Sequence, residues 1–160
     1  MLVAASAFVV ALGTPAAQNA PTAKVTASLG RVFGHELAVD TVRIDTTNVI
    51  RVRRGDSLLG FAQVRNVKGK DQPITFLVAI DPEARLRDVD ILVYREPYGG
   101  EVAYESWRRQ FRGKGPGDPI QLGRDIRGIS GATISVNSVT DGVRRALAEL
   151  AQWRKQGLLH

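Results

Sequence analysis

Apolar and polar positions alternate through the middle of the chain, from about residue 38 to residue 94. Alternation with a period of two is typical of a strand with one buried face, and an unbroken apolar run is typical of a central strand covered on both faces. Short polar clusters between the runs contain Asp, Asn, Gly and Lys, which favour tight turns. The pattern therefore predicts an antiparallel meander with strands at about residues 39–44, 49–52, 58–67, 74–80 and 86–94.

Helical spacing replaces the strand pattern on either side of the meander. Apolar residues recur three and four positions apart over residues 25–37, 102–111 and 136–153, which predicts a helix in each range. In the second helix we expect Trp107 and Phe111 to be core anchors rather than contacts to a ligand. Together with the meander, these helices indicate an α+β fold, a single domain with helices packed on an antiparallel sheet.

The other stretches of the C-terminal half are predicted to be less regular. Residues 112–119 contain several glycines and a lysine, which suit a phosphate cradle, although a plain flexible linker is the simpler interpretation. Residues 120–122 are a candidate short strand. Residues 154–160 are predicted to form a frayed tail.

The N-terminus predicts export. Residues 1–17 are apolar and small, and a polar tract of small residues follows at 18–22. The apolar run is shorter than the ~20 residues that a membrane-spanning helix needs, which favours a secretory signal peptide. No Lys or Arg precedes the run, so an uncleaved anchor and a buried first helix stay open. We predict a signal peptide or N-terminal anchor over residues 1–23, a folded domain over residues 24–153, and a periplasmic or other extracytoplasmic location.

Composition narrows the chemistry. With 44% hydrophobic and 24% charged residues, the 160-residue chain has the make-up of one globular domain. It contains no Cys, which excludes disulfides, thiolate-bound metals and cysteine-ligated iron–sulfur clusters, and its two His are too far apart for a His-based metal site. The net charge of +6 comes from basic residues interleaved with acidic ones, so nucleic-acid binding is not predicted. Any redox chemistry therefore needs an organic cofactor.

Small hydroxyl residues and glycine gather at residues 130–135, Ser-Gly-Ala-Thr-Ile-Ser, just before the last predicted helix. The first backbone N–H groups of a helix have no internal acceptors and carry partial positive charge, so such an end binds phosphate readily. An ordinary Ser or Thr N-cap is the alternative interpretation. The sequence contains no recognisable nucleophile and base of a hydrolase, so we predict no catalytic residues.

Residues 130–135 resemble the S-G-A-T-x-[ST] signature of the FMN-binding domain family. That family includes the C subunit of the Na⁺-translocating NADH:quinone oxidoreductase and the G subunit of the Rnf electron-transport complex. Two further segments match in the same order. Residues 96–101, Glu-Pro-Tyr-Gly-Gly-Glu, resemble an E-T-P-G-x-G-like loop, and residues 107–114 resemble a W-x-x-x-F-x-G-K segment. The resemblance covers about residues 33–150.

What the resemblance implies is a flavoprotein that uses FMN. In the family, a transferase takes FMN from FAD and joins its phosphate to the final Thr of the motif, which is Thr133 here. The chain would then be the substrate of an FAD:protein FMN transferase and an electron carrier with membrane-bound redox partners, rather than an independent enzyme. The cofactor-binding residues implied are Thr133 as the covalent acceptor, with Ser130, Gly131, Ala132, Ser135, Glu96, Gly99 and Gly100 around it.

One position departs from the family pattern. Members modified by the transferase usually carry an Asp three residues before the Ser, where this chain has Arg127, and Asp125 lies two positions earlier. An arginine can neutralise a phosphate, but it can also disturb recognition by the transferase. Three functions stay open: an exported electron carrier with covalent FMN, a sensory or binding module that holds FMN non-covalently, and an interaction domain without a cofactor.

Overall fold

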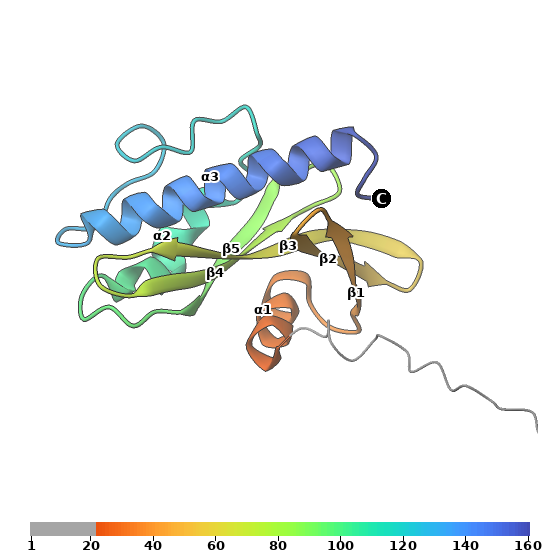
Figure 1. The fold of residues 1–160 in the computed structure, drawn as a ribbon, viewed down its shortest axis with the longest axis horizontal. Coiled ribbons are helices and arrows are strands. Elements are labelled where there is room, and N and C mark those ends of the chain that lie inside the picture. The colour runs from red at the N-terminus through yellow and green to blue at the C-terminus, as the bar shows by residue number, and fades with distance from the viewer. Residues whose placement is uncertain (1–21) are drawn as a thin grey trace, which may run out of the picture.

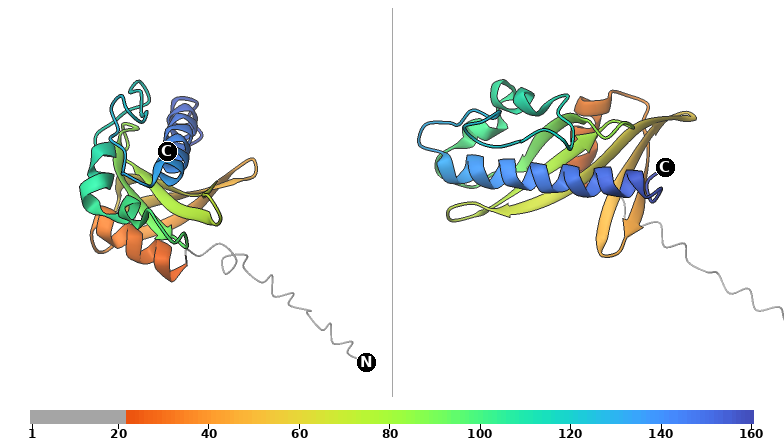
Figure 2. Two further views of the ribbon diagram at one scale, coloured as in Figure 1. Left: turned by 90° about the vertical axis from the view of Figure 1, so that its left-hand side faces the viewer. Right: turned by 90° about the horizontal axis from the view of Figure 1, so that it is seen from above.

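The computed structural model describes residues 22–160, which form an antiparallel sheet with helices on both faces (Figures 1 and 2). The five strands follow the order β1-β2-β3-β4-β5, each antiparallel to its neighbours, so the predicted meander and the α+β fold are confirmed. The strands are β1 (Ala38–Ile44), β2 (Thr47–Arg54), β3 (Ser57–Lys68), β4 (Pro73–Ile80) and β5 (Leu86–Val93), and the helices are α1 (Ala23–Phe33), η2 (Gly100–Ala103), α2 (Glu105–Arg108), η3 (Arg109–Phe111) and α3 (Thr133–Lys155).

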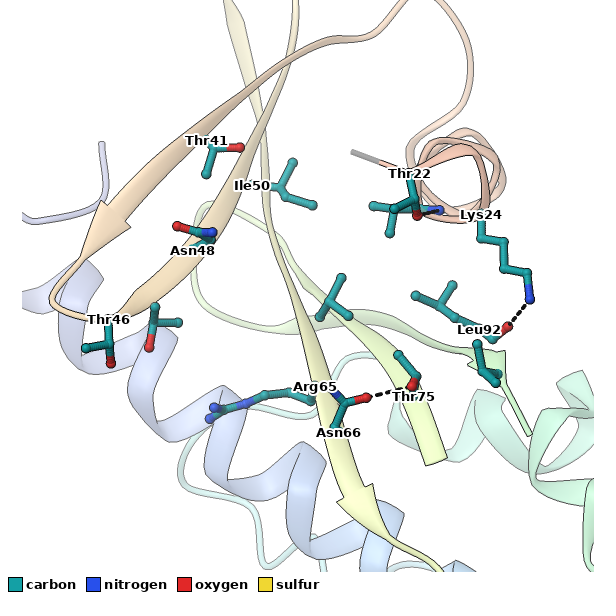
Figure 3. Close-up of a pocket in the computed structure, with 14 residues that line it drawn as sticks. Thr22, Lys24, Thr41, Thr46, Asn48, Ile50, Arg65, Asn66, Thr75 and Leu92 are labelled. Carbon is teal, nitrogen blue, oxygen red and sulfur yellow. Dashed lines mark hydrogen bonds between the residues drawn. The ribbon is translucent and has the colours of Figure 1, made fainter. Parts of the chain in front are cut away.

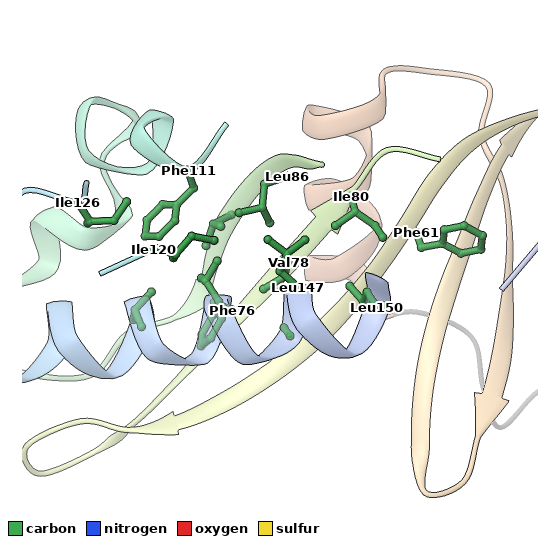
Figure 4. Packing of buried hydrophobic residues seen from close by; sticks show 14 of the residues in the cluster. Phe61, Phe76, Val78, Ile80, Leu86, Phe111, Ile120, Ile126, Leu147 and Leu150 are labelled. Carbon is green, nitrogen blue, oxygen red and sulfur yellow. The ribbon is translucent and has the colours of Figure 1, made fainter. Parts of the chain in front are cut away.

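Alternate residues of β4 belong to two separate cores, which explains its unbroken apolar sequence. Phe76 and Ile80 belong to the larger core, on the side of the sheet that α3 covers (Figure 4). Leu77 and Ala79 belong to a smaller core under α1, on the opposite face. The stripe of α3 that seals the larger core consists of Val136, Val139, Val143, Ala146, Leu147 and Leu150.

The helix predicted over residues 102–111 is interrupted. Tyr104 has an extended backbone (φ −72°, ψ 137°) between η2 and α2, and the Arg108 Nε atom donates to the Ala103 carbonyl across the break at 2.9 Å. Helices this short gain little from their own backbone bonds, so tertiary contacts decide the geometry. Trp107 and Phe111 are buried and pack edge to face with ring centroids 5.2 Å apart, which confirms them as core anchors.

Two carboxylates of β5 fix the helices that flank it. Asp90 accepts a hydrogen bond of 2.6 Å from the Ser28 hydroxyl on α1. Asp88 pairs with Arg108 at 3.1 Å and with Arg112 at 2.9 Å. These ion pairs hold the segment from α2 to η3 against the sheet. They also neutralise the charges of Arg108 and Arg112.

Residues 120–122 do not form the predicted strand. The Asp125 carboxylate accepts hydrogen bonds from the first two backbone N–H groups of this segment, at 3.1 and 2.8 Å. These bonds fold the segment into a compact turn. Its sheet-like pairing is limited to an isolated β-bridge between Leu122 and Ile126. The local carboxylate acceptor therefore outweighs the strand preference of three residues.

The prediction of a frayed tail at residues 154–160 is wrong. Helix α3 continues to Lys155, and Leu159 beyond it is 1% exposed and belongs to the larger core. The Arg154 guanidinium fixes this end by donating to the carbonyl of Leu159 at 2.6 Å and to that of Pro82 at 2.8 Å. The chain end is thus anchored by one buried leucine and one arginine.

The first helix begins just before the predicted domain boundary at residue 24. Thr22 is its N-cap and accepts a hydrogen bond from the Val25 N–H at 3.4 Å. Gly34, at φ +91°, ends the helix before the predicted residue 37. The predicted signal peptide or anchor lies almost wholly outside the described residues. Within residues 22–160, no helix is long and apolar enough to cross a membrane.

Candidate cofactor site

A cavity of about 330 Å³ opens at the N-terminal end of α3. Three segments meet there: the turn between β3 and β4, the loop that follows β5, and residues 131–135. The two motifs that the sequence singled out separately are thus brought to one place. Of the predicted cofactor-binding residues, Glu96, Gly131, Ala132, Thr133 and Ser135 line the cavity, whereas Ser130, Gly99 and Gly100 lie outside its lining.

A wider depression of about 630 Å³ lies on the α1 side of the sheet (Figure 3). Its walls are mostly threonine, asparagine and aliphatic side chains from the start of α1 and from the strands. Its two cations are engaged, since Lys24 donates to the Leu92 carbonyl at 3.4 Å and Arg65 pairs with Glu149 at 2.7 Å. The depression contains no residue of either motif, so the smaller cavity is the better candidate despite its size.

The start of the motif is a tight turn that requires glycine. The Ala132 N–H donates to the Ile129 carbonyl at 3.1 Å, which closes a four-residue turn. Gly131 takes φ +77° at its third position, a conformation that favours glycine. The turn leaves Thr133 as the first residue of α3, with its side chain exposed. The hydroxyl of Thr133 is therefore accessible from solvent.

The N-terminus of α3 has no side-chain cap. Its N-cap is Ala132, not one of the hydroxyl residues, so the ordinary Ser or Thr N-cap considered for this motif is wrong. The backbone N–H groups of Thr133, Ile134 and Ser135 have no acceptor among the described residues, and the first turn contains no acidic side chain. Unsatisfied N–H groups at the positive end of a helix dipole attract an anion.

Ser135 faces into the protein rather than into solvent. It is buried, and its Oγ lies 3.0 Å from the Tyr94 hydroxyl, which also donates to the Tyr98 carbonyl. Tyr94 thus links the first turn of α3 to the loop after β5. Tyr94 is not recognisable as a site residue from the sequence, because an aromatic residue at a strand end is typical of core packing.

Gly99 is the point where this loop contacts the motif. A Cβ atom at Gly99 would lie 2.8 Å from the Cβ of Ala132 and 2.7 Å from the Tyr94 hydroxyl oxygen. Gly99 also has φ +84°. A Cβ atom at Gly100 would have no heavy atom within 4 Å. Of the two glycines, only the first is needed for the close approach.

Glu96 fixes the third wall of the cavity. Its Oε1 accepts hydrogen bonds from the backbone N–H groups of Asp71 at 2.8 Å and Gln72 at 3.0 Å. The hydrogen bond from the Gln72 N–H is the main cause of the lowered pKa of Glu96. Together with smaller contributions from Asp71 and Lys70, it outweighs the opposing effect of burial. The carboxylate therefore holds the β3–β4 turn in place beside the motif, in addition to lining the cavity.

Two side chains of the Trp107 segment hold the backbone just before the motif. The Trp107 Nε1–H donates to the Arg127 carbonyl at 2.8 Å, and the Gln110 Oε1 accepts from the Arg127 N–H at 2.8 Å. The Gln110 Nε2 in turn donates to the Trp107 carbonyl at 3.0 Å. Arg127 is therefore fixed by its backbone, while its side chain is exposed.

Asp125 is committed to the fold. Burial favours its neutral form, but hydrogen bonds from the Gln121 N–H, from Lys114 and from the Ile120 N–H together lower its pKa. Lys114 lies 3.0 Å from its carboxylate. The same ion pair engages the lysine of the glycine-rich loop, which leaves that loop no free cation to cradle a phosphate.

Comparison with known proteins identifies the family. A model of the FMN-binding domain matches residues 69–148, half of the chain. The matched range contains every residue that lines the cavity at α3. The chain belongs to the FMN-binding domain family. Its cofactor is FMN, and the family resemblance seen in the sequence is confirmed.

One relative of this FMN-binding domain is a subunit of a redox complex, and one solved structure shares its fold. The chain is 27% identical over 106 residues to the G subunit of the proton-translocating ferredoxin:NAD⁺ oxidoreductase complex of Clostridium ljungdahlii, a match that covers 61% of this chain and 57% of that relative. The crystal structure of NqrC from Shewanella oneidensis shares the fold, with a TM-score of 0.55 at 19% identity over 70% of this chain and 60% of that one. The chain thus matches little more than half of the curated relative's length.

Five residues of the cavity wall, Lys70, Asp71, Pro97, Tyr98 and Ile134, were not among the cofactor-binding residues predicted from the sequence. Lys70 and Asp71 belong to a turn whose sequence is that of an ordinary hairpin, and only tertiary folding brings it to the motif. Tyr98 and Ile134 are 81% and 50% exposed, and no periodicity distinguishes them from other surface residues. Within residues 22–160, no group of His, Cys, Asp and Glu side chains is placed to hold a metal ion.

Proposed function

We propose that this FMN-binding domain is an exported electron carrier that holds FMN through a phosphoester on Thr133. The observation that carries the proposal is the uncapped N-terminus of α3. An exposed threonine hydroxyl stands at its first position, beside three backbone N–H groups without acceptors among the described residues. A phosphate at this position would accept hydrogen bonds from those N–H groups and lie at the positive end of the helix dipole. An anion placed there is stabilised by roughly 0.3–2 kcal/mol.

The chain's own residues suit the rest of FMN as well. Gly131 and Ala132 add no bulk beside Thr133, so both the phosphate and a modifying enzyme can approach its hydroxyl. Tyr98 and Ile134 supply exposed apolar surface on the cavity wall. Tyr94 holds Ser135 and the loop after β5 in position through its hydroxyl group. FMN, once bound, supplies one- and two-electron chemistry, and the protein supplies its orientation.

The proposed attachment is a transfer from FAD catalysed by an FAD:protein FMN transferase. The Thr133 Oγ forms a bond to the phosphorus of the FMN half, the diphosphate P–O bond of FAD breaks, and AMP leaves. The hydroxyl proton is released. The chain supplies the acceptor hydroxyl and a site for the phosphate, and the transferase supplies the catalytic groups.

Export and membrane-bound redox partners complete the proposal. The apolar run at residues 1–17 supports a signal peptide or an anchor, and the curated relative is part of a proton-translocating complex. We therefore place the folded domain outside the cytoplasm, periplasmic in a cell with two membranes. Fractionation of expressing cells and N-terminal sequencing of the folded protein test this location. Protein that stays in the cytosol with an intact Met1 would contradict it.

Flavin fluorescence in a denaturing gel tests the attachment. After co-expression with the transferase, wild-type protein and the Ser138→Ala variant are expected to fluoresce, because Ser138 lies outside both the motif and the cavity lining. Thr133→Ala is expected to be dark. Fluorescence that persists in Thr133→Ala, or a dark wild-type protein, would overturn the covalent proposal.

A second candidate is a module that holds FMN non-covalently in the same cavity. Arg127, which stands where modified members carry Asp, favours this function. It predicts a yellow protein that loses its colour on denaturation and dialysis, with no change of mass. Colour that stays with the polypeptide would exclude it.

A further inference from the structure

We propose that the cleft beside the FMN cavity, lined by Arg109 and Arg127, is the docking surface for an acidic redox partner protein. The proposal rests on the proposed function, because it assigns the surface across which FMN exchanges electrons. Its charged side chains, Arg109 and Arg127, do not line the cavity around Thr133.

The cleft has a volume of about 380 Å³ and lies between the α2–η3 segment and residues 127–129. It adjoins the FMN cavity through the turn of the motif. Ile129 lines the cleft and Ala132 lines the cavity, and the two are joined by the hydrogen bond that closes this turn. A protein seated on the cleft would therefore reach the edge of the FMN site.

Charges in the cleft are left unpaired. Arg108, the neighbour of Arg109, is bound to Asp88 and to two backbone carbonyls. Arg109 and Arg127 make no ion pair or side-chain hydrogen bond within residues 22–160. The carboxylate of Glu101 also lines the cleft, yet it pairs with neither of them. The fold thus leaves two guanidinium groups unpaired at one edge of the cofactor site.

Exposed aromatic and aliphatic side chains lie on the walls of the cleft, where Tyr104 is, and of the adjoining FMN cavity. Among the described residues, six large hydrophobic side chains are exposed, and three of them border the cleft or the cavity. These are Tyr98, Tyr104 and Ile134, at 81%, 62% and 50% exposure. Tyrosine and arginine are enriched at protein interfaces, where they act as anchors. The surface therefore fits a protein rather than a small anion.

Charge complementarity selects an acidic partner. A guanidinium group can bind a carboxylate with two parallel hydrogen bonds. Arg109 and Arg127 each provide one such guanidinium group. The net charge of the chain, +6, adds long-range attraction for a negative surface. Such attraction raises association rates and weakens as salt is added. The cleft is thus suited to fast, salt-sensitive encounters with a negatively charged protein.

A binding experiment on the flavin-free protein tests the cleft independently of FMN. The probe is hexaglutamate, followed by the backbone and indole N–H signals in an NMR titration. We expect shifts at Trp107, Gly128 and Ile129, and at least about threefold weaker binding in the Arg109→Gln/Arg127→Gln double variant. The control is Arg145→Gln, an exposed arginine about 18 Å along α3 from Thr133. Shifts spread evenly over the surface, or equal binding by all variants, would overturn the proposal.

A kinetic experiment on the flavin-loaded protein tests the same surface with redox probes. Each reduced FMN gives one electron to each of two hexacyanoferrate(III) ions and releases two protons. At low salt, the double variant is expected to react at least about threefold more slowly with this anion, and no more slowly with the cation hexaamminecobalt(III). Arg145→Gln is expected to match wild type. Equal slowing with both oxidants, or no slowing, would overturn the docking proposal. A protein that takes up no flavin would overturn the proposed function instead, and the NMR titration would then decide the docking proposal alone.

Discussion

Gly99 and Ala132 are in direct contact. A Cβ atom on Gly99 would lie only 2.8 Å from the Cβ of Ala132, closer than two carbon atoms can approach. This contact joins the loop after β5 to the motif at the start of α3, which are more than thirty residues apart in sequence. The geometry of the FMN cavity therefore depends on the absence of a side chain at one position.

Gly99→Ala is predicted to destabilise the domain and to lower its flavin content. The new Cβ would clash with Ala132 and with the Tyr94 hydroxyl, and the backbone at φ +84° disfavours alanine. The combined cost is about 2 kcal/mol or more. Gly100→Ala is the matched control, with open space around its Cβ and an expected change within about 0.5 kcal/mol. Urea unfolding measures both, and equal midpoints for the two variants would contradict the role of Gly99.

The Glu96 carboxylate is predicted to stabilise the fold in its ionised form. Its pKa is lowered in the folded state, chiefly by the hydrogen bond from the Gln72 N–H. Its contribution is therefore complete above the unfolded pKa of about 4.3 and is lost as the pH falls through the lowered folded value. Glu96→Gln keeps an acceptor oxygen but cannot titrate. The difference in unfolding midpoint between wild type and Glu96→Gln should be constant from pH 7 to pH 5 and shrink below pH 4. If the difference between the two unfolding midpoints instead grew as the pH falls, the prediction would be wrong, because the pKa of Glu96 would then be raised by folding.

Gln63→Met is predicted to stabilise the protein. Gln63 is fully buried, and neither of its amide atoms has a hydrogen-bond partner among the described residues. An unsatisfied buried amide costs roughly 1–3 kcal/mol, and methionine has a similar shape without that cost. Thermal unfolding of the two proteins decides the point. A lower midpoint for the variant would show that the amide is satisfied in solution, for example by a buried water.

The sheet could be predicted because its signals are local and repeated. β4 is apolar throughout since both its faces are covered, whereas the flanking strands combine apolar residues of the two cores with exposed polar residues. Turn residues separate every pair of strands. These features need no knowledge of the tertiary structure, and all five strands were found at nearly their observed positions.

The errors have a common physical cause, which is specific side-chain hydrogen bonds and burial that a periodic pattern does not reveal. Asp125 turns residues 120–122 away from a strand, and Arg154 with Leu159 anchors an end that composition alone marks as loose. In the site, the motif residues were found, but Tyr94 and Lys70 were not. Their contribution arises from strands and turns that only the folded chain brings to α3.

Arg127→Asp is predicted to leave stability unchanged and to increase flavin attachment. Trp107 and Gln110 hold the backbone of residue 127, and its side chain is exposed, so the expected change in unfolding free energy is within about 0.5 kcal/mol. The substitution restores the acidic residue that modified family members usually carry. We expect the initial rate of labelling by the transferase to rise by up to about tenfold, the equivalent of roughly 1.4 kcal/mol. A slower rate with unchanged stability would show that Arg127 assists attachment.

The most direct measurement is the intact mass of the chain after co-expression with the transferase, followed by mapping of the modified peptide. The account predicts a mass gain of one FMN less one water, located on Thr133 in the peptide that contains residues 128–144. It also predicts no gain in Thr133→Ala and an unchanged gain in Ser138→Ala. A wild-type chain of unmodified mass, or FMN attached to any other residue, would contradict it.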